Sequence, residues 1–121
     1  MPMIEFRHDS KKISGVQAVQ LCAPLEEALR STLRRIRPAR GDDYSVFVEG
    51  DAFNVCHNQP DLRIYVFYHP SWEFNDDELS GLPRTMAGFL EPTLEGLGLS
   101  HLRTTIRFYR RDGHSSLSFG G

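Results

Sequence analysis

The first eight residues, Met1–His8, read MPMIEFRH, and the rest of the chain can be arranged around them. From Met3 onward the side chains alternate, with Ile4 and Phe6 on one side and Met3, Glu5 and Arg7 on the other. A period of two is typical of a half-buried strand. Pro2 then stands at the head of that strand. Because proline is small enough to permit removal of an initiator methionine, we expect Met1 to be cleaved and Pro2 to present a secondary amine.

The amine of Pro2 is the candidate catalytic group. An N-terminal amine titrates near ~8 in model peptides, far closer to neutrality than a lysine does. An apolar pocket disfavours the charged form of the amine, and a neighbouring arginine lowers its pKa further. Such an amine would be neutral at pH 7 and able to take a proton from carbon or oxygen. The alternative is that Pro2 has no chemical role, since many unrelated proteins also begin with Met-Pro.

Length, composition and charge limit the class of protein to which the chain can belong. The 121 residues are 40% apolar, enough for one core, and we expect a single domain over residues 1–121. A net charge of −2 gives no overall attraction to nucleic acid or to an anionic membrane. No apolar run approaches transmembrane length, and the start of the chain lacks the apolar core of a signal peptide. We therefore expect a cytoplasmic protein with no nucleic-acid or membrane partner.

Motifs for metals and cofactors are missing from the sequence. Cys22 and Cys56 have neither a CxxC partner nor paired-histidine spacing, and no two of the five histidines stand at helical metal-ligand spacing. No GxSxG, P-loop or GxGxxG motif is present. The sequence therefore predicts a protein without a metal or a cofactor.

The remaining elements follow from periodicity and turn residues. An apolar stripe at positions 16, 19, 22, 25, 29, 33 and 36 predicts a helix that Pro24 either kinks or begins. A second apolar stripe, which includes Phe89, predicts another helix over 78–97. Trp72 and Phe74 precede it and are expected to cover the sheet edge or the helix end, with a pocket rim as the alternative. Strands are predicted over 44–49, with a resumption over 52–55 after Gly50-Asp51 as an open alternative, and over 62–69, 102–110 and 114–119, with a hairpin turn at Asp112-Gly113.

These elements run β-α-β twice, and the two halves resemble each other. A shift of 61 positions lays Ile4–His8 on Tyr65–His69, and it also lays Tyr44–Glu49 on Thr105–Arg110. We therefore predict an α/β fold built from a tandem β-α-β repeat, with units of about 1–58 and 59–121. The fold would have a four-stranded mixed sheet, two helices on one face and a C-terminal hairpin.

The other face of this sheet is predicted to meet further copies of the chain. It would carry Met3, Glu5 and Arg7 from the first strand and Thr105, Arg107 and Tyr109 from the last. This pattern is too polar for a buried helical layer, yet a sheet with one such face is often closed by other subunits. We expect a homotrimer.

With Pro2 at the head of an alternating strand and two β-α-β units, the chain resembles the tautomerase superfamily. Its length and layout are similar to the branch that includes macrophage migration inhibitory factor and 5-carboxymethyl-2-hydroxymuconate isomerase. Some uncharacterised bacterial members begin MPHLRFR, and MPMIEFR here keeps the proline, Phe6 and Arg7. The resemblance implies a homotrimer with pockets between neighbouring subunits, Pro2 as the base and no cofactor.

The resemblance carries over unevenly to the other site residues. Arg40 stands four residues before Tyr44, where the migration-factor branch has a lysine four residues before a tyrosine. Thr105 and Arg107 stand where that branch has a tyrosine and an asparagine, so neither type is kept. Arg40 and Arg107 would suit a substrate with carboxylates, because a guanidinium can grip a carboxylate bidentately. Arg7 is a third candidate for substrate binding, and Tyr44 is a fourth.

Two functions from different classes follow. The first is a cofactor-independent tautomerase or isomerase that acts on a small α-keto or unsaturated carboxylic acid, with Pro2 as general base. A close variant is a hydratase or dehalogenase in which Pro2 stays protonated. The second is a non-catalytic trimeric binding or scaffold protein that has kept the fold and lost the chemistry.

Overall fold

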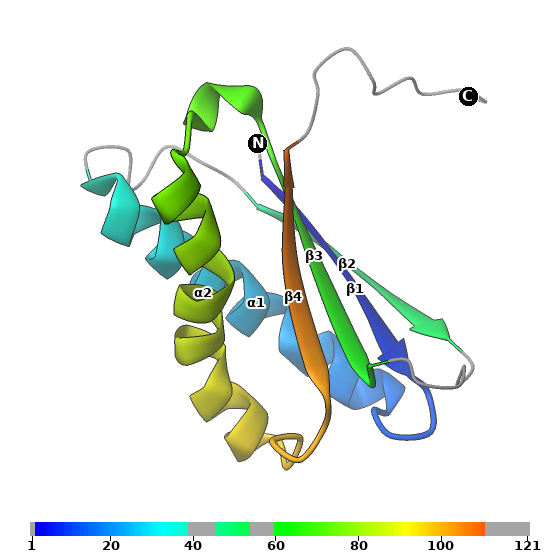
Figure 1. The fold of residues 1–121 in the computed structure, drawn as a ribbon. Coiled ribbons are helices and arrows are strands. Elements are labelled where there is room, and N and C mark those ends of the chain that lie inside the picture. The colour runs from blue at the N-terminus through cyan, green and yellow to red at the C-terminus, as the bar shows by residue number, and fades with distance from the viewer. Residues whose placement is uncertain (1, 39–45, 54–59, 111–121) are drawn as a thin grey trace, which may run out of the picture.

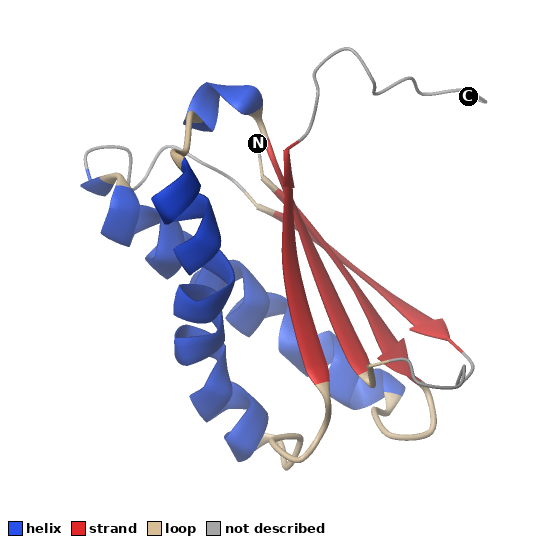
Figure 2. Cartoon of the chain, in the orientation of Figure 1, coloured by secondary structure: helices blue, strands red, loops and turns tan. Residues whose placement is uncertain are grey.

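The computed structural model describes residues 2–38, 46–53 and 60–110. In chain order its elements are β1 (Met3–Asp9), α1 (Gly15–Ile36), β2 (Phe47–Phe53), β3 (Leu62–Tyr68), the 3-10 helix η2 (Pro70–Trp72), α2 (Asp76–Gly96) and β4 (Thr104–Arg110). The strands form one sheet in the order β2-β1-β3-β4. Each outer strand runs parallel to its inner neighbour, and the two inner strands, β1 and β3, are antiparallel. Both helices lie on the same side of the sheet (Figures 1 and 2).

The predicted fold class is confirmed: an α/β fold with a mixed four-stranded sheet and two helices. One boundary was wrong, because β2 runs without interruption through Gly50-Asp51, where the sequence suggested a break. The predicted hairpin turn and the strand over 114–119 lie outside the described residues. The division into units of about 1–58 and 59–121 stays a prediction.

The proposed shift of 61 positions does not match the two halves face to face. It lays Ile4, which is buried against the helices, on Tyr65, whose side chain points to the opposite face. No single shift fits both strand pairs, since Met3 pairs with Phe47, 44 positions on, whereas Leu62 pairs with Thr104, 42 positions on. A shift of one residue moves every side chain of a strand to the opposite face of the sheet. The two halves therefore share the order of their elements but not one register.

Helix α1 begins at a reciprocal capping box. Ser14 Oγ accepts from the Gln17 N–H at 3.1 Å, and Gln17 Oε1 accepts from the Ser14 N–H at 2.9 Å. Pro24 lies inside the helix without ending it. The expected stripe was wrong at its start, since Val16 and Val19 are 70% and 74% exposed. At 100° per residue Val16 lies about 180° around the helix from the buried Leu25, so both cannot face the sheet.

Helix α2 begins at a second capping box, formed by Asn75 and Glu78, and has three acidic residues in its first turn. Those carboxylates suit the positive end of the helix dipole. Phe89 was expected on the buried stripe but is 42% exposed. The helix ends before Gly98, whose φ of 73° lies in the left-handed region that glycine adopts without strain.

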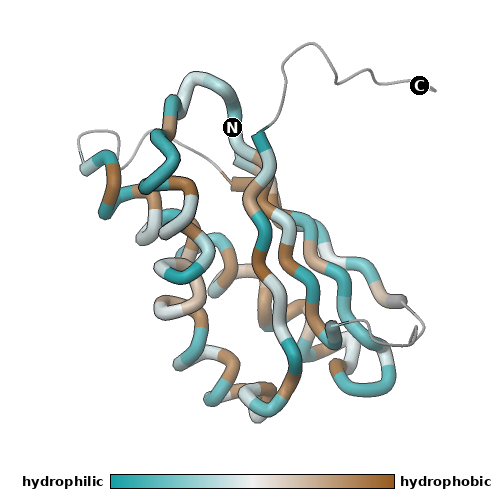
Figure 3. The backbone as a smooth tube through the Cα atoms, in the orientation of Figure 1, coloured by the Kyte–Doolittle hydropathy of each residue, from teal (hydrophilic) through white to brown (hydrophobic). Residues whose placement is uncertain are grey.

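One core fills the space between the helices and the sheet. Ile4 and Phe6 of β1 are at most 1% exposed, and Leu62, Ile64 and Val66 of β3 are fully buried. Figure 3 shows this alternation as apolar and polar residues that succeed one another along the central strands. The two inner strands therefore hold the sheet to the helix layer, whereas the sheet face away from the helices, called here the outer face, carries the intervening side chains.

Asp61 holds three segments together at the end of the sheet where β3 begins. Its carboxylate accepts from Lys12 Nζ at 2.8 Å and from the Arg103 N–H at 3.0 Å, and its carbonyl accepts from the Asp9 N–H at 2.9 Å. The hydrogen bond from Lys12 and then that from Arg103 lower the pKa of the Asp61 carboxyl below its ordinary value. Asp61 therefore supports the fold in its charged form.

Replacing Asp61 by alanine is expected to lower the free energy of unfolding at neutral pH by about 1 kcal/mol, the usual net value of such hydrogen bonds. Because the folded-state pKa lies below the unfolded one, this contribution is complete above pH ~4 and is lost as the pH falls through the folded-state pKa. Urea unfolding of both proteins between pH ~6 and ~2 measures the difference. A difference in the free energy of unfolding that stays constant down to the lowest pH would contradict the charged role of Asp61.

Candidate active site

The register of the sheet places Pro2 at one end of all four strands. Met3 pairs with Phe47 at the start of β2 and with Phe67 near the end of β3. The last residue of β3, Tyr68, pairs in turn with Arg110 at the end of β4. Pro2 precedes Met3, so it lies at this same end, called here the Pro2 end. Its carbonyl accepts a hydrogen bond from the Phe47 N–H at 3.3 Å, and the residue is buried.

Three aromatic residues, called here the aromatic cap, close the helix side of the Pro2 end: Tyr68, Trp72 and Phe74. Phe74 meets the Tyr68 ring edge-on at 5.1 Å between centroids and stacks on the Trp72 ring at 5.7 Å. Trp72 is only 3% exposed, which supports the expectation that this segment covers the sheet end. The cap makes the surroundings of the Pro2 end apolar on its helix side.

Arg37 ties the aromatic cap to both helices. Its guanidinium forms a bidentate pair with the Glu78 carboxylate, with Nη2 to Oε1 at 3.1 Å, and it lies 5.8 Å from the centre of the Phe74 ring. Nη2 also donates to the carbonyl of Glu73 at 3.3 Å. The hydrogen bond from Arg37 lowers the pKa of the Glu78 carboxyl, and the Asn75 N–H adds to this effect. Arg37, which ends α1, is thus occupied in holding the α2 start in place.

On the outer face, side chains paired in register form rows across the sheet. In order of distance from Pro2, the rows are Phe47, Met3, Phe67 and Tyr109; Glu49, Glu5, Tyr65 and Arg107; and Asp51, Arg7, Arg63 and Thr105. The first of these rows is called here the apolar row. Phe47 is 62% exposed. The Phe67 and Tyr109 rings stack at 5.6 Å. The sheet therefore carries aromatic or apolar side chains on both faces at the Pro2 end, and the outer face becomes charged with distance from it.

Arg107 lies in the second row, beside two tyrosines. A hydrogen bond with Tyr109, followed by charge interactions with Tyr109 and Tyr65, raises the pKa of the Arg107 guanidinium. Three strand positions and two strand spacings separate Arg107 from Pro2, or about 14 Å between Cα atoms. An arginine side chain does not span that distance. Within one chain, the Arg107 side chain therefore does not contact Pro2.

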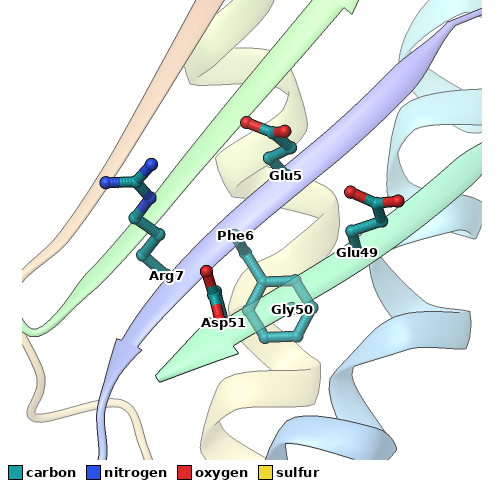
Figure 4. A pocket seen from close by; sticks show the side chains of 6 residues that line it. All are labelled: Glu5, Phe6, Arg7, Glu49, Gly50 and Asp51. Atoms are coloured by element: carbon teal, nitrogen blue, oxygen red, sulfur yellow. The ribbon is translucent and has the colours of Figure 1, made fainter. Parts of the chain in front are cut away.

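Arg7 lies at the opposite end of β1 from Pro2. Five residue rises along the strand separate the two, which amounts to about 16 Å. Arg7 instead borders an open pocket of about 380 Å³ with the three carboxylates of Glu5, Glu49 and Asp51 (Figure 4). The structure therefore separates Arg7 from Pro2. Arg40 and Tyr44, the two other predicted binding residues, lie outside the described residues.

Sequence reasoning missed Arg110, the one arginine of the four strands that lies at the Pro2 end. It borders a pocket of about 310 Å³ whose lining also includes Tyr68 and Phe74 of the aromatic cap. Arg110 lies three residues after Arg107, so it points to the helix side of the sheet. Only the pairing of Tyr68 with Arg110 reveals this position, because the sequence shows Arg110 as the last residue of a polar strand end.

No helix within residues 2–38, 46–53 and 60–110 is long and apolar enough to cross a membrane. Among the same residues, no group of three or more histidine, cysteine, aspartate or glutamate side chains is placed to hold a metal ion.

Comparison with solved structures identifies proteins of similar fold. Malonate semialdehyde decarboxylase matches 98% of this chain and 91% of its own at a TM-score of 0.54 and 12% identity. Pt0534, in a structure inactivated by 2-oxo-3-pentynoate, matches 99% and 92% at 0.53 and 16%. A probable enzyme from the thermophilic fungus Aspergillus fumigatus matches 93% and 76% at 0.53 and 13%. No protein-family model and no curated protein matches the sequence.

Proposed function

Because the chain has the tautomerase-like fold of malonate semialdehyde decarboxylase and Pt0534, we propose that it is a cofactor-independent tautomerase. Its substrate would be a small α-keto or unsaturated carboxylic acid, and Pro2 would be the general base. The observation that carries the proposal is the position of Pro2. It is buried at the head of an inner strand, between the aromatic cap and the apolar row.

The chemistry needs a neutral amine, which Pro2 supplies once Met1 is removed. Its nitrogen takes a proton from the carbon next to the keto group, so that a C–H bond breaks and an N–H bond forms. The electron pair moves onto the carbonyl oxygen to give an enolate. The Pro2 ammonium then returns the proton to oxygen or to another carbon. Apolar surroundings favour the neutral amine at the start, because they disfavour its charged form.

The substrate carboxylate requires a cation near Pro2. Arg110 lies at the Pro2 end of the same chain, whereas Arg107 could serve only the Pro2 of a neighbouring copy. We propose that both bind the carboxylate, with Arg40 and Tyr44 as the further binding residues suggested by the sequence. Arg7, which lies about 16 Å from Pro2 along its own strand, could reach only the site of a neighbouring copy. The apolar row supports association into a homotrimer, since it would otherwise leave Phe47 and Tyr109 in water. Assembly would then bring Arg107 of one copy to the Pro2 of the next.

The fold neighbours widen the range of reactions to be tested. The structure of malonate semialdehyde decarboxylase is described as a basis for decarboxylase and hydratase activities, and it includes a mutant in which a proline is replaced by alanine. A hydratase variant would keep Pro2 protonated, so that its charge polarises the substrate instead of removing a proton. The assay should therefore include substrates for tautomerisation, decarboxylation and hydration.

A covalent label tests whether Pro2 is a free nucleophilic amine. We expect 2-oxo-3-pentynoate, an electrophilic alkynyl ketone, to add once per chain at the Pro2 nitrogen. Intact mass first establishes that Met1 is absent, and peptide mapping then locates the adduct. A protein extended by a few residues before Pro2 serves as the control, since its Pro2 nitrogen is an amide and should not react. Equal labelling of both proteins, or none of the free-amine form, would favour the non-catalytic binding protein.

A further inference from the structure

A further, open hollow lies on the helix layer. It is lined by Arg35 of α1 and by Arg84, Thr85, Gly88 and Phe89 of α2, and its volume is about 510 Å³. Pockets for small molecules commonly measure ~300–1,000 Å³, so its size suits a ligand of that class. No step of the proposed reaction uses these residues.

Two of the residues that line this hollow are arginines, and neither has a carboxylate partner among the described residues. Arg30 and Arg34 of α1 pair with Glu26 and Glu27. In contrast, within residues 2–38, 46–53 and 60–110 neither Arg35 nor Arg84 makes an ion pair. Both side chains are exposed. Two positive charges at one concave surface attract an anion, and the Thr85 hydroxyl adds a hydrogen-bond donor.

The rest of the hollow offers a flat apolar contact. Phe89 is 42% exposed and is not packed against the core, although it sits on an otherwise amphipathic helix. Gly88 lies beside it, and a Cβ at that position would meet nothing within 4 Å. Glycine is unfavourable inside a helix, and no packing within the described fold requires it here. Its lack of a side chain leaves the Phe89 ring open to a planar group.

We propose that this hollow binds a small aromatic phosphate ester. The phosphate is preferred over a carboxylate because one guanidinium already satisfies both oxygens of a carboxylate. A phosphate monoester has three terminal oxygens and close to two negative charges, which match Arg35 and Arg84 together. The aromatic part of the ligand stacks on Phe89. This site is separate from the proposed site at Pro2.

Calorimetric titration in low-salt buffer tests the proposal with three probes: phenyl phosphate, inorganic phosphate and benzyl alcohol. Phenyl phosphate is expected to bind at least ~10-fold more tightly than inorganic phosphate, and benzyl alcohol should not bind. Arg35→Ala and Arg84→Ala should each weaken phenyl phosphate binding at least ~10-fold. Phe89→Leu should reduce the affinity for phenyl phosphate to that for inorganic phosphate.

Matched controls separate this site from general anion attraction and from Pro2. Arg34→Ala removes a neighbouring cation that is paired with Glu27, and it should leave binding unchanged. The protein extended before Pro2 should also bind phenyl phosphate as the unextended protein does. The proposal is overturned if phenyl phosphate does not bind, or if it binds no better than inorganic phosphate. An affinity for phenyl phosphate in both arginine variants equal to that of the unmodified protein would overturn it as well, and so would loss of binding in the extended protein.

Discussion

Protein extended by a few residues before Pro2 is expected to lose at least ~100-fold in kcat, the usual contribution of one general base. An amide nitrogen has no basic lone pair, so it cannot take the proton. Pro2→Ala should lose less, because a primary amine remains with a different basicity and geometry. Steady-state kinetics on a small α-keto acid gives kcat and kcat/KM for the three proteins. Full activity in the extended protein would end the proposed mechanism.

Mixing two inactive variants tests whether the substrate at Pro2 is bound by Arg107 of a neighbouring copy or by Arg110 of the same chain. If Arg107 of one copy acts on the Pro2 of the next, Arg107→Ala and the extended protein should each be inactive alone. Refolding them together should restore part of the activity, because every mixed trimer contains one intact site. Arg110→Ala mixed with the extended protein should not recover, since Arg110 belongs to the same chain as its Pro2. Sedimentation of each sample measures assembly, and a stable monomer would exclude the shared site.

Gly50→Ala is expected to destabilise the protein by about 2 kcal/mol, within the range for overpacking a core. A Cβ on Gly50 would lie 2.4 Å from the Phe6 ring, far inside any real contact. Figure 4 shows the ring across the strand at this position. Phe6 is 1% exposed, so its ring cannot move aside without disturbing the core. Urea unfolding gives the change in free energy of unfolding.

Two further variants test the cause of the Gly50 effect. In a Phe6→Leu background, the added Gly50→Ala change should cost less than it does alone, because the shorter side chain leaves room for the Cβ. Gly81→Ala in α2 is the matched control, since a Cβ there meets nothing within 4 Å, and it should stabilise the helix slightly. Equal costs of Gly50→Ala with Phe6 and with Leu at position 6 would contradict the packing explanation.

Gly50 also shows why the sequence predicted one part of β2 wrongly. Glycine followed by aspartate is a strong local signal for a turn, and that signal suggested a break in the strand. The residue is instead needed by a neighbour distant in sequence, since the Phe6 ring of β1 lies over it. Local reasoning placed β1, β3 and both helices because their periodicity is strong. Local reasoning could not show that Gly50 must be glycine, because this requirement arises only when β1 and β2 are paired.

The same limit applies to the helices and to the candidate site. Val16, Val19 and Phe89 extended the apolar stripes in sequence, but the angle around each helix turns them from the core. Pro2 could be singled out from its position in the chain. Arg110 could not, because its place at the Pro2 end depends on the register between β3 and β4. Register is set by packing of the whole sheet, which no single segment contains.

The place of β1 in the sheet has a consequence for how the amine could be made. β1 is synthesised first, yet it is an inner strand, and both of its neighbours, β2 and β3, are encoded later. At ~5–20 residues per second, the ribosome takes about 3–12 seconds to go from β1 to the end of β3. β2 can pair with one edge of β1 sooner, but until β3 is complete the other edge has no partner, and the leading residues of the strand are open to an aminopeptidase. Under the proposed function, removal of Met1 would therefore compete with folding, and a chain that closes its sheet too early would keep its proline acylated.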